Sequence, residues 1–372
     1  MDKIWHLVFN FFLISAYFDP LNSFGSRTIL LMISGAICVL VIPKLVLNIN
    51  RWHKRFFFVF FIPIYGVLLY ILRGGQFQNF SDTSYISSAV VIASTLVFKR
   101  INFSSLLRYI YTVSLAFSLL LFASAFELVL SDSRNIIDYI FTHDIGRVAF
   151  RTYGGIDVPF IYFFASPLLL LPIGIIVSKL LDNTILNYER FLLFVFTFAL
   201  LLSGTRSHIF ISICVFLIYI HKLRNILYQY LFFLFVFVLV ILPNLNVFQQ
   251  MLGMNNESNS FKFSMLKVYS EVFSEPLSFL FGQGFNAHAW DFRLSDILQG
   301  DASKSELTYL EYIRVFGFPS FLYFIYIVIS SFNIVNVLRV SFILLLVDSL
   351  LNPHLFSTYG SIIVGLYLNK YE

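Results

Sequence analysis

Long apolar segments recur along the whole chain, and their length constrains the fold more than any other feature. A helix needs about 20 apolar residues to cross the hydrocarbon core of a bilayer. Hydrophobic residues make up 59% of the 372 residues and charged residues only 12%, which leaves too little polar surface to cover a soluble domain. The sequence therefore predicts an all-α polytopic membrane protein, with residues 1–372 forming a single integral-membrane domain. About twelve spans are expected, near residues 4–18, 28–47, 56–73, 84–98, 105–130, 157–178, 187–203, 207–221, 226–245, 306–331, 333–348 and 355–369.

Basic residues gather in short loops at alternate ends of these segments, which indicates the cytoplasmic side. They are Lys3, Arg51, Lys54, Arg55, Lys99, Arg100, Lys179, Arg190, Lys222, Arg224, Arg339 and Lys370. Both termini are thus expected in the cytoplasm, and loops 131–156 and 246–305 outside it. The net charge of +5 is spread over these loops without a basic patch, so no nucleic-acid partner is expected.

The external loop 246–305 carries the pattern of a structured segment. Between Ser260 and Ser274, apolar residues fall on one helical face and charged residues on the other, which is typical of a helix lying along a membrane surface. Glu275-Pro276 ends this helix and Gly282-Gln283-Gly284-Phe285 follows. We therefore expect the loop to present or cover the functional site.

Two of the arginines in the other external loop lie close to a pair of glycines. Arg147 and Arg151 are four residues apart, and Gly154-Gly155 follows them. Guanidinium forks bind anions well, and glycines let a backbone approach a ligand closely. The alternatives are that the arginines bind lipid headgroups or pair with Asp144 and Asp157.

Ser203-Gly204-Thr205-Arg206-Ser207 separates two apolar segments with almost no loop. Counting from His221 at the inner face, a helix rise of 1.5 Å per residue places Arg206 about 23 Å up, within the hydrocarbon layer of roughly 30 Å. An arginine at that depth is costly unless it faces a partner or a wet cavity, so it is a candidate site residue. The alternative is that its side chain extends outward to the headgroups.

Other polar residues are expected near the outer face. Glu311 and Arg314 are three apart on one helix and should neutralise each other. His143 and His208 have no companion at metal-ligand spacing, so we interpret both as structural and expect no metal. Nucleotide-binding motifs are also absent from the sequence. The remaining polar positions are Glu127, His288, Asp291, Arg293, Glu306, Asp348, Asn352 and His354.

Three segments in fixed order carry a family resemblance. They are Ser203–Ser207 before a helix, Glu275-Pro276-Leu277 leading to Gly282-Gln283-Gly284, and Ser305–Glu311 running on to Phe316-Gly317. In order, spacing and external side they resemble the bacterial O-antigen polymerase and ligase superfamily over about residues 190–330. Asn352-Pro353-His354 and the arginine-glycine loop add weaker support. Ligases of that superfamily carry a His-Asn pair where this chain has Ser305-Glu306, so the resemblance is closer to the Wzy-type polymerases.

The resemblance implies a GT-C-like membrane glycosyltransferase without metal, nucleotide or other cofactor. It would join O-antigen repeat units carried on undecaprenyl diphosphate at the periplasmic face of the inner membrane, with inversion. Glu306 and Arg206 are the expected catalytic residues, although Glu306 also suits a helix N-terminus. Diphosphate binding is assigned to Arg206, Arg147, Arg151 and Lys262, the last standing where the family commonly has arginine. Substrate contacts are assigned to His288, Tyr309, Arg314 and His354.

Other functions compete with this expectation. An O-antigen ligase is the near relative, and a flippase or transporter of the same lipid-linked oligosaccharide is motivated by the twelve spans. Transporters place charged sites near mid-membrane, whereas here the polar residues collect at one face. A noncatalytic membrane scaffold is the third alternative. The expected partners are lipid-linked oligosaccharide, membrane lipids and a chain-length regulator protein.

Overall fold

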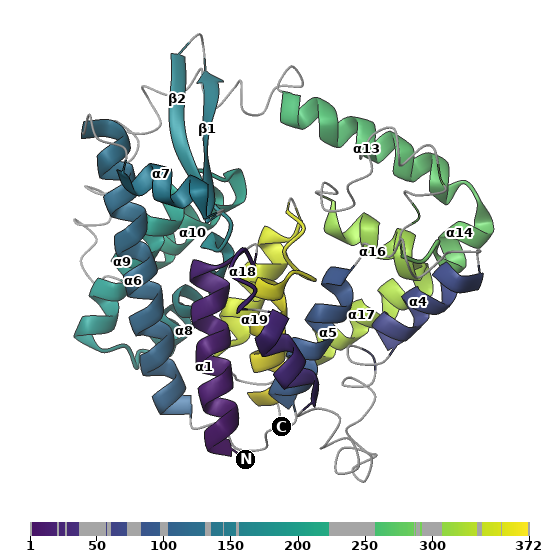
Figure 1. Cartoon of the computed structure of the whole chain (residues 1–372), viewed down its shortest axis with the longest axis horizontal. Coiled ribbons are helices and arrows are strands. Elements are labelled where there is room, and N and C mark those ends of the chain that lie inside the picture. Colours follow the sequence, from purple (N-terminus) through teal and green to yellow (C-terminus); the bar gives the residue numbers. More distant parts are fainter. Residues whose placement is uncertain are drawn as a thin grey trace. The chain divides into compact units, whose positions relative to one another are not determined.

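The computed structural model is mostly helical (Figure 1). It describes residues 2–20, 22–26, 28–36, 57, 61–72, 83–96, 103–130, 135–143, 145–153, 156–222, 257–285, 287, 291, 307–332, 337–350 and 352–370. The chain divides into two compact units. Unit 1 comprises Met1–Phe12, Arg27–Asn102 and Lys262–Glu372, and unit 2 comprises Leu13–Ser26 and Phe103–Phe261. The division falls within α1 (Asp2–Phe18) and within α13 (Glu257–Phe273).

Unit 2 is built around helix α8, which is apolar on every side. All its residues from Leu170 to Ser178 are buried, as expected for a helix enclosed by others. Around it pack η4, α6, α9 and α10. The elements of unit 2 are α6 (Phe103–Leu130), α7 (Asn135–Thr142), β1 (Gly146–Tyr153), β2 (Ile156–Phe163), η4 (Ser166–Leu169), α8 (Leu170–Leu181), α9 (Asn187–Leu202) and α10 (Arg206–Lys222).

Buried polar groups hold the connection between α8 and α9. Lys179 Nζ donates a short hydrogen bond to the buried carboxylate of Glu189, and Tyr111 donates to the same oxygen at 3.1 Å. The other oxygen of Glu189 accepts Leu186 N at 3.0 Å, which satisfies a backbone donor at the start of α9. Lys179, expected as a loop charge, is thus also an ion-pair partner inside unit 2.

The structure has an antiparallel hairpin where the sequence predicted an external loop and the start of a span. Strand β1 pairs with β2 over its full length, from Gly146 opposite Phe163 to Tyr153 opposite Ile156. The span expected at 157–178 is therefore wrong in its first part, since helix begins only at Ser166. Apolar β-branched and aromatic residues fit a strand as well as a buried helix, so hydropathy alone cannot separate the two.

Unit 1 contains a pair of helices, α5 and α19, that pack side by side (Figure 1). Gly365 permits the contact, because a Cβ there would lie 2.2 Å from Thr95 Oγ1. Asn369 Nδ2 donates to the carbonyl oxygen of Thr95 at 2.5 Å. The other elements are α4 (Ile62–Leu72), α14 (Pro276–Phe281), α16 (Thr308–Phe316), α17 (Phe318–Phe332) and α18 (Arg339–Asp348), with α5 at Thr83–Leu96 and α19 at Thr358–Lys370.

The span expected at 306–331 is two helices, not one. Gly317 separates α16 from α17 with φ of +81°, and its N–H donates to the carbonyl of Ile313 at 2.8 Å. A positive φ is a usual way for a helix to end at glycine. Pro319 then occupies the first turn of α17, where its missing N–H costs nothing.

The other expected spans coincide only in part with membrane-length helices. Helices α1, α5, α6, α9 and α10 begin and end within two residues of the predicted bounds. Among the described residues, one stretch, Phe103–Leu128 in α6, is long and apolar enough to cross a membrane by itself. A buried core helix can meet the same criterion, so the fold is established here as mostly helical and the twelve spans remain a proposal. The span expected at 226–245 lies outside the described residues.

Candidate functional site

The segment that follows α14 lies along the last turn of α16. Gln283 N donates to the carbonyl of Arg314 at 2.6 Å, and Gly284 N to that of Val315 at 3.1 Å. The Gln283 side chain is fully buried, and its Nε2 donates to the carboxylate of Asp291 at 2.9 Å. The Gly-Gln-Gly motif is therefore part of an ordered backbone contact within unit 1.

Phe285 fixes the same segment to α4. Its N–H donates to the carbonyl of Gly66 at 3.3 Å, and its ring occupies the space that a side chain at Gly66 would need. A Cβ at Gly66 would lie 2.4 Å from the ring. The ring also meets Phe316 edge to face, with centroids 5.8 Å apart. Helices α4 and α16 are thus joined through this one segment.

A buried ion pair lies beside this contact. Arg314 Nε and Nη2 donate to the two carboxylate oxygens of Glu311 at 2.7 and 2.5 Å. Tyr269 of α13 donates its hydroxyl to Glu311 at 2.8 Å, and Arg314 Nη1 reaches the Gly284 carbonyl at 3.4 Å. Arg314 is only 1% exposed, so the two-pronged pair neutralises it inside the protein. The expected neutralisation of Glu311 by Arg314 is confirmed.

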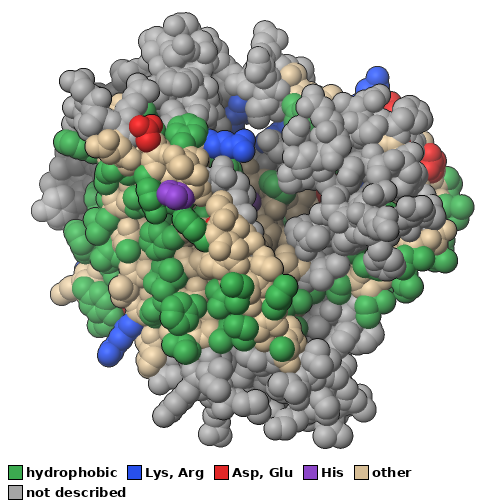
Figure 2. Space-filling view, viewed as in Figure 1, with side chains coloured by type: hydrophobic (Ala, Val, Ile, Leu, Met, Phe, Trp, Pro, Cys, Tyr) green, Lys and Arg blue, Asp and Glu red, His purple; other side chains and the backbone are tan. Residues whose placement is uncertain are grey.

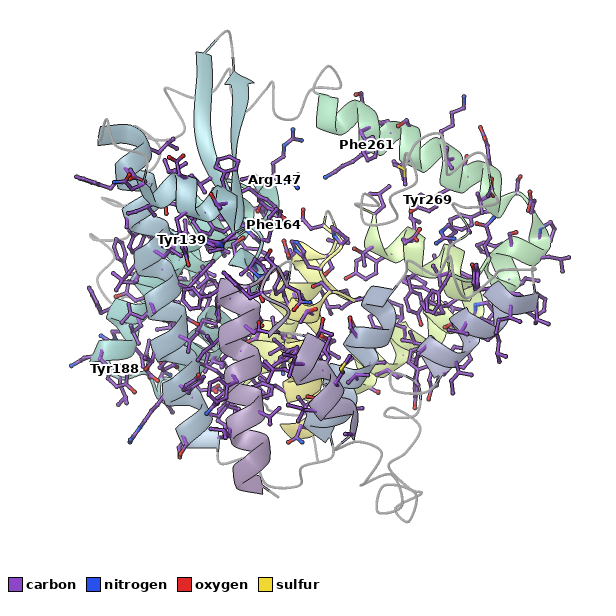
Figure 3. All side chains as sticks on the ribbon, viewed as in Figure 1. Tyr139, Arg147, Phe164, Tyr188, Phe261 and Tyr269 are labelled. Carbon is purple, nitrogen blue, oxygen red and sulfur yellow. The ribbon has the colours of Figure 1, made fainter. Side chains whose placement is uncertain are left out.

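The apolar face of α13 is buried in protein. Met265, Tyr269 and Val272 are each at most 1% exposed, and Tyr269 reaches α16 through its hydroxyl. Figure 3 labels Tyr269 on α13. The helix expected between Ser260 and Ser274 is present, but this face packs against unit 1 and is not free to lie on a membrane.

The start of α16 is bound to the end of α18 and the loop after it. Thr308 Oγ1 donates to the carbonyl of Asn352 at 2.6 Å, and the Tyr309 hydroxyl to that of Leu346 at 2.7 Å. The motif around residues 305–311 and Asn352-Pro353-His354 therefore meet, although about forty residues separate them in the sequence.

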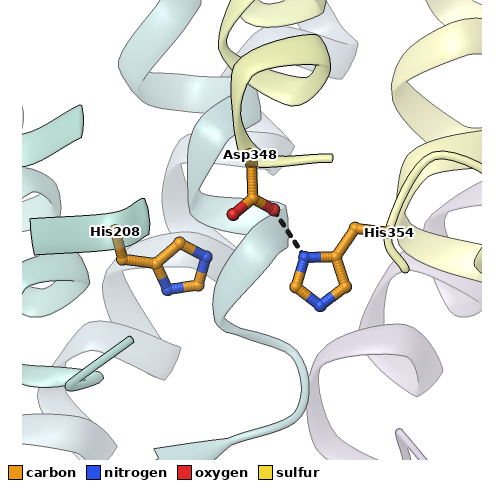
Figure 4. A group of neighbouring side chains, drawn as sticks. All are labelled: His208, Asp348 and His354. Carbon is orange, nitrogen blue, oxygen red and sulfur yellow. Dashed lines mark hydrogen bonds and ion pairs between the residues drawn. The ribbon is translucent and has the colours of Figure 1, made fainter. Parts of the chain in front are cut away.

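This loop carries a buried histidine-carboxylate pair (Figure 4). His354 Nδ1 lies 2.5 Å from Asp348 Oδ2, and Asn352 Nδ2 donates to Asp348 Oδ1 at 2.8 Å. Asp348 is fully buried and His354 is 6% exposed. Figure 4 also draws His208, which belongs to unit 2 and is described with it.

In unit 2, the Ser-Gly-Thr-Arg sequence forms a tight helix-to-helix turn as predicted. Ser203 ends α9, and Gly204 follows with φ of +72°, the left-handed conformation common after a helix. Thr205 Oγ1 accepts the N–H of His208 at 3.3 Å and so caps α10. The Ser203 hydroxyl and His208 Nδ1 are 2.7 Å apart, which supports the structural interpretation of His208.

Arg206 is the first residue of α10 and is half-buried. The positive end of the helix macrodipole disfavours a cation at this position. Helix stability therefore does not account for an arginine here.

Arg147 lies on β1 and is exposed. Its guanidinium carbon is 5.6 Å from the centroid of the Phe164 ring, a cation–π distance that leaves its N–H groups available to other acceptors (Figure 3). His143 stacks on Phe24, with ring centroids 5.1 Å apart, and meets the ring of Tyr139 at a tilt, with centroids 4.3 Å apart. His143 is thus a packing residue of unit 2.

The remaining predicted site residues are distributed as follows. Glu306 and His288 lie outside the described residues, as does the side chain of Arg151. Lys262 is half-buried in α13 and belongs to unit 1 together with Tyr309, Arg314 and His354. Arg206, Arg147 and the backbone of Arg151 belong to unit 2. The gathering of these cations around one diphosphate therefore stays a prediction.

Tyr269 and Asp348 are among the residues of these clusters that were not selected as site residues from the sequence. Tyr269 was assigned to an apolar helix face, yet a tyrosine there needs a partner for its hydroxyl. Asp348 was named only as a polar residue near the outer face. An aspartate at the end of an apolar segment, six residues before a histidine, is the signal that could have drawn attention to it.

Comparison of the chain with protein-family models, with curated proteins and with solved structures gave no match.

Proposed function

We propose that this chain is a polytopic protein of a bacterial inner membrane, with twelve spans and both termini in the cytoplasm. Large apolar side chains are numerous on its described surface and charged ones are few (Figure 2). The side chains of Phe126 on α6, Phe191 on α9 and Phe210 on α10 are 63%, 66% and 59% exposed. Such surface would aggregate in water, whereas lipid accommodates it.

We further propose that the protein polymerises undecaprenyl-diphosphate-linked O-antigen repeat units by glycosyl transfer at the periplasmic face. The observation that carries this proposal is the meeting, inside unit 1, of segments 282–285, 308–317 and 352–354. These are segments on which the family resemblance rests, and they join through buried polar contacts in an otherwise apolar chain. Buried polar groups are costly, so a cluster of them in a membrane protein favours a functional centre.

The reaction assigns roles to the cations and to one base. Negative charge develops on the diphosphate as its bond to the sugar carbon breaks. Fixed positive charge lowers the energy of that transition state. Arg206 takes this role, with Arg147, Arg151 and Lys262 as further diphosphate ligands. The acceptor hydroxyl needs a proton acceptor, for which Glu306 is the candidate from the sequence. Polyprenyl chains would lie between helices, in contact with lipid.

The direct test is to incubate the purified protein with a synthetic lipid-linked repeat unit and no other enzyme. We expect a ladder of products, each one repeat unit longer than the last. Transfer only to a lipid A-core acceptor would identify a ligase instead. If neither product forms while the protein remains folded, the proposed glycosyl transfer is wrong.

Replacing Arg206 with alanine is expected to lower the polymerisation rate about 10²- to 10³-fold, the usual effect of removing one stabiliser of developing charge. Surface polysaccharide length in the producing cell reports the loss as a shift to single repeat units. Lysine at the same position keeps the charge without the two-pronged fork and should restore activity in part.

Arg190→Ala is the matched control, because Arg190 is exposed at the other end of α9. It should leave chain length unchanged. Long chains from the Arg206→Ala strain would remove Arg206 from the mechanism, and lipid-linked units trapped inside the cell would favour a transporter.

A further inference from the structure

The strongest chemistry in unit 1 that the proposed reaction has not yet used is the pair formed by Asp348 and His354. Asp348 is the last residue of α18, where the macrodipole and full burial both disfavour an anion. His354 Nδ1 at 2.5 Å and Asn352 Nδ2 at 2.8 Å offset that penalty by contacting the two carboxylate oxygens separately. A carboxylate held in this way fixes the orientation of the imidazole ring through Nδ1.

The pair is held rigidly by its own loop. The carbonyl of His354 accepts Ser357 N at 3.1 Å and Ser357 Oγ at 2.6 Å. Gly360 lets the loop pack directly on α19, since a Cβ there would lie 2.1 Å from the His354 carbonyl oxygen. The imidazole is therefore oriented in advance, as a catalytic base requires.

The loop is also tied to α16 and α5. Phe356 stacks on Tyr312 with centroids 5.3 Å apart, and its carbonyl accepts a short hydrogen bond from Ser88. Thr308 bonds to the Asn352 carbonyl at 2.6 Å. The loop that carries the histidine is thus bound to the start of α16, the helix that follows the segment expected to supply the base.

We propose that His354 is the proton acceptor of the glycosyl transfer and that Asp348 positions it. Nδ1 faces Asp348, which directs Nε2, on the far side of the ring, away from the carboxylate (Figure 4). This inference rests on the proposed polymerase function, and it replaces Glu306 as the base.

In the proposed step, Nε2 takes the proton of the acceptor hydroxyl while that oxygen forms a bond to the anomeric carbon. The bond between the anomeric carbon and the diphosphate oxygen breaks, and the diphosphate leaves with the electron pair. The imidazolium that results is stabilised by Asp348 and later releases its proton to water or to the departing diphosphate. No other reactant is needed.

The test measures polymerisation by the purified full chain acting on a synthetic lipid-linked repeat unit. His354→Ala should lower kcat about 10²-fold or more with little change in KM, since general base catalysis contributes about 10²- to 10⁴-fold. Added imidazole should restore part of the rate of His354→Ala, a result that a purely structural role would not give. Asp348→Asn should also lower kcat with KM unchanged, and imidazole should not restore it.

His221→Ala is the matched control, because His221 is exposed near the end of α10, and its rate should equal that of the wild type. A rate for His354→Ala within about threefold of wild type would overturn the base assignment and leave the polymerase proposal intact. Loss without rescue by imidazole would assign His354 to the fold of the loop and would also overturn it. Absence of ladders from the wild type would instead contradict the proposed function.

Discussion

Replacing Glu311 with alanine is expected to lower the free energy of unfolding by about 3–5 kcal/mol. The change leaves the guanidinium of Arg314, 1% exposed, without the carboxylate that accepts two of its hydrogen bonds at 2.5 and 2.7 Å. It also removes the acceptor of the Tyr269 hydroxyl. Thermal unfolding of the purified protein in detergent measures the loss as a lower midpoint.

A double variant separates the unpaired charge from the loss of packing. Replacing Glu311 and Arg314 together with methionine removes both charges and should be less destabilising than Glu311→Ala alone. Glu271→Ala is a surface control on α13 and should change stability by less than about 0.5 kcal/mol. If the double variant lost as much free energy of unfolding as its two single variants added together, the unpaired buried charge would not be the cause of the destabilisation.

The sequence predicted this pair by spacing but not its surroundings. Glu311 and Arg314 are three residues apart, so a shared helix face follows from helix geometry alone. Their burial depends on Tyr269 in α13 and on the Gly284 carbonyl, which come from segments distant in sequence. Local periodicity carries no information about such contacts, so an amphipathic helix facing protein looked the same as one facing a membrane.

The helices themselves were largely predictable, because long apolar segments leave few alternatives. The predicted spans are wrong where a continuous apolar segment contains a change of backbone conformation. Gly317 with Pro319 two residues later is a helix stop followed by a helix start, yet the hydropathy of 306–331 is unbroken. In 157–178, Val158, Phe160 and Tyr162 suit a strand, and pairing with β1 decided the outcome.

The histidine-carboxylate pair shows the same limit at the candidate site. His354 was selected from the sequence, but Asp348 lies six residues away, a separation at which neither a regular helix nor a regular strand would bring the two side chains into contact. The turn after α18 brings the two together, and Thr308 ties that turn to α16. Residues gathered by turns therefore need the structure, whereas a helix start, such as that of α10 after Thr205, can be predicted from capping patterns.

Replacing Gly317 with alanine is expected to lower the free energy of unfolding by at least about 3 kcal/mol. Its φ of +81° strains any other residue, and a Cβ there would lie 2.2 Å from the Leu280 carbonyl oxygen. Gly282 is the reciprocal position: its φ is +78°, and a Cβ there would lie 2.4 Å from the Val315 carbonyl oxygen. Gly282→Ala should therefore have a similar effect. In both cases the obstacle is backbone, which cannot rotate away as a side chain can.

Gly25→Ala isolates the conformational part of this effect. Gly25 also has a positive φ, of +68°, but nothing lies within 4 Å of its Cβ position. Gly25→Ala should lower the free energy of unfolding by only about 1–2 kcal/mol, the cost of the left-handed conformation alone. The excess loss at Gly317 and Gly282 then measures the close approach of the two backbones. Equal losses of unfolding free energy at all three glycines would mean that the segment after α14 does not pack on the end of α16. The surroundings of the Glu311–Arg314 pair would then differ from those described.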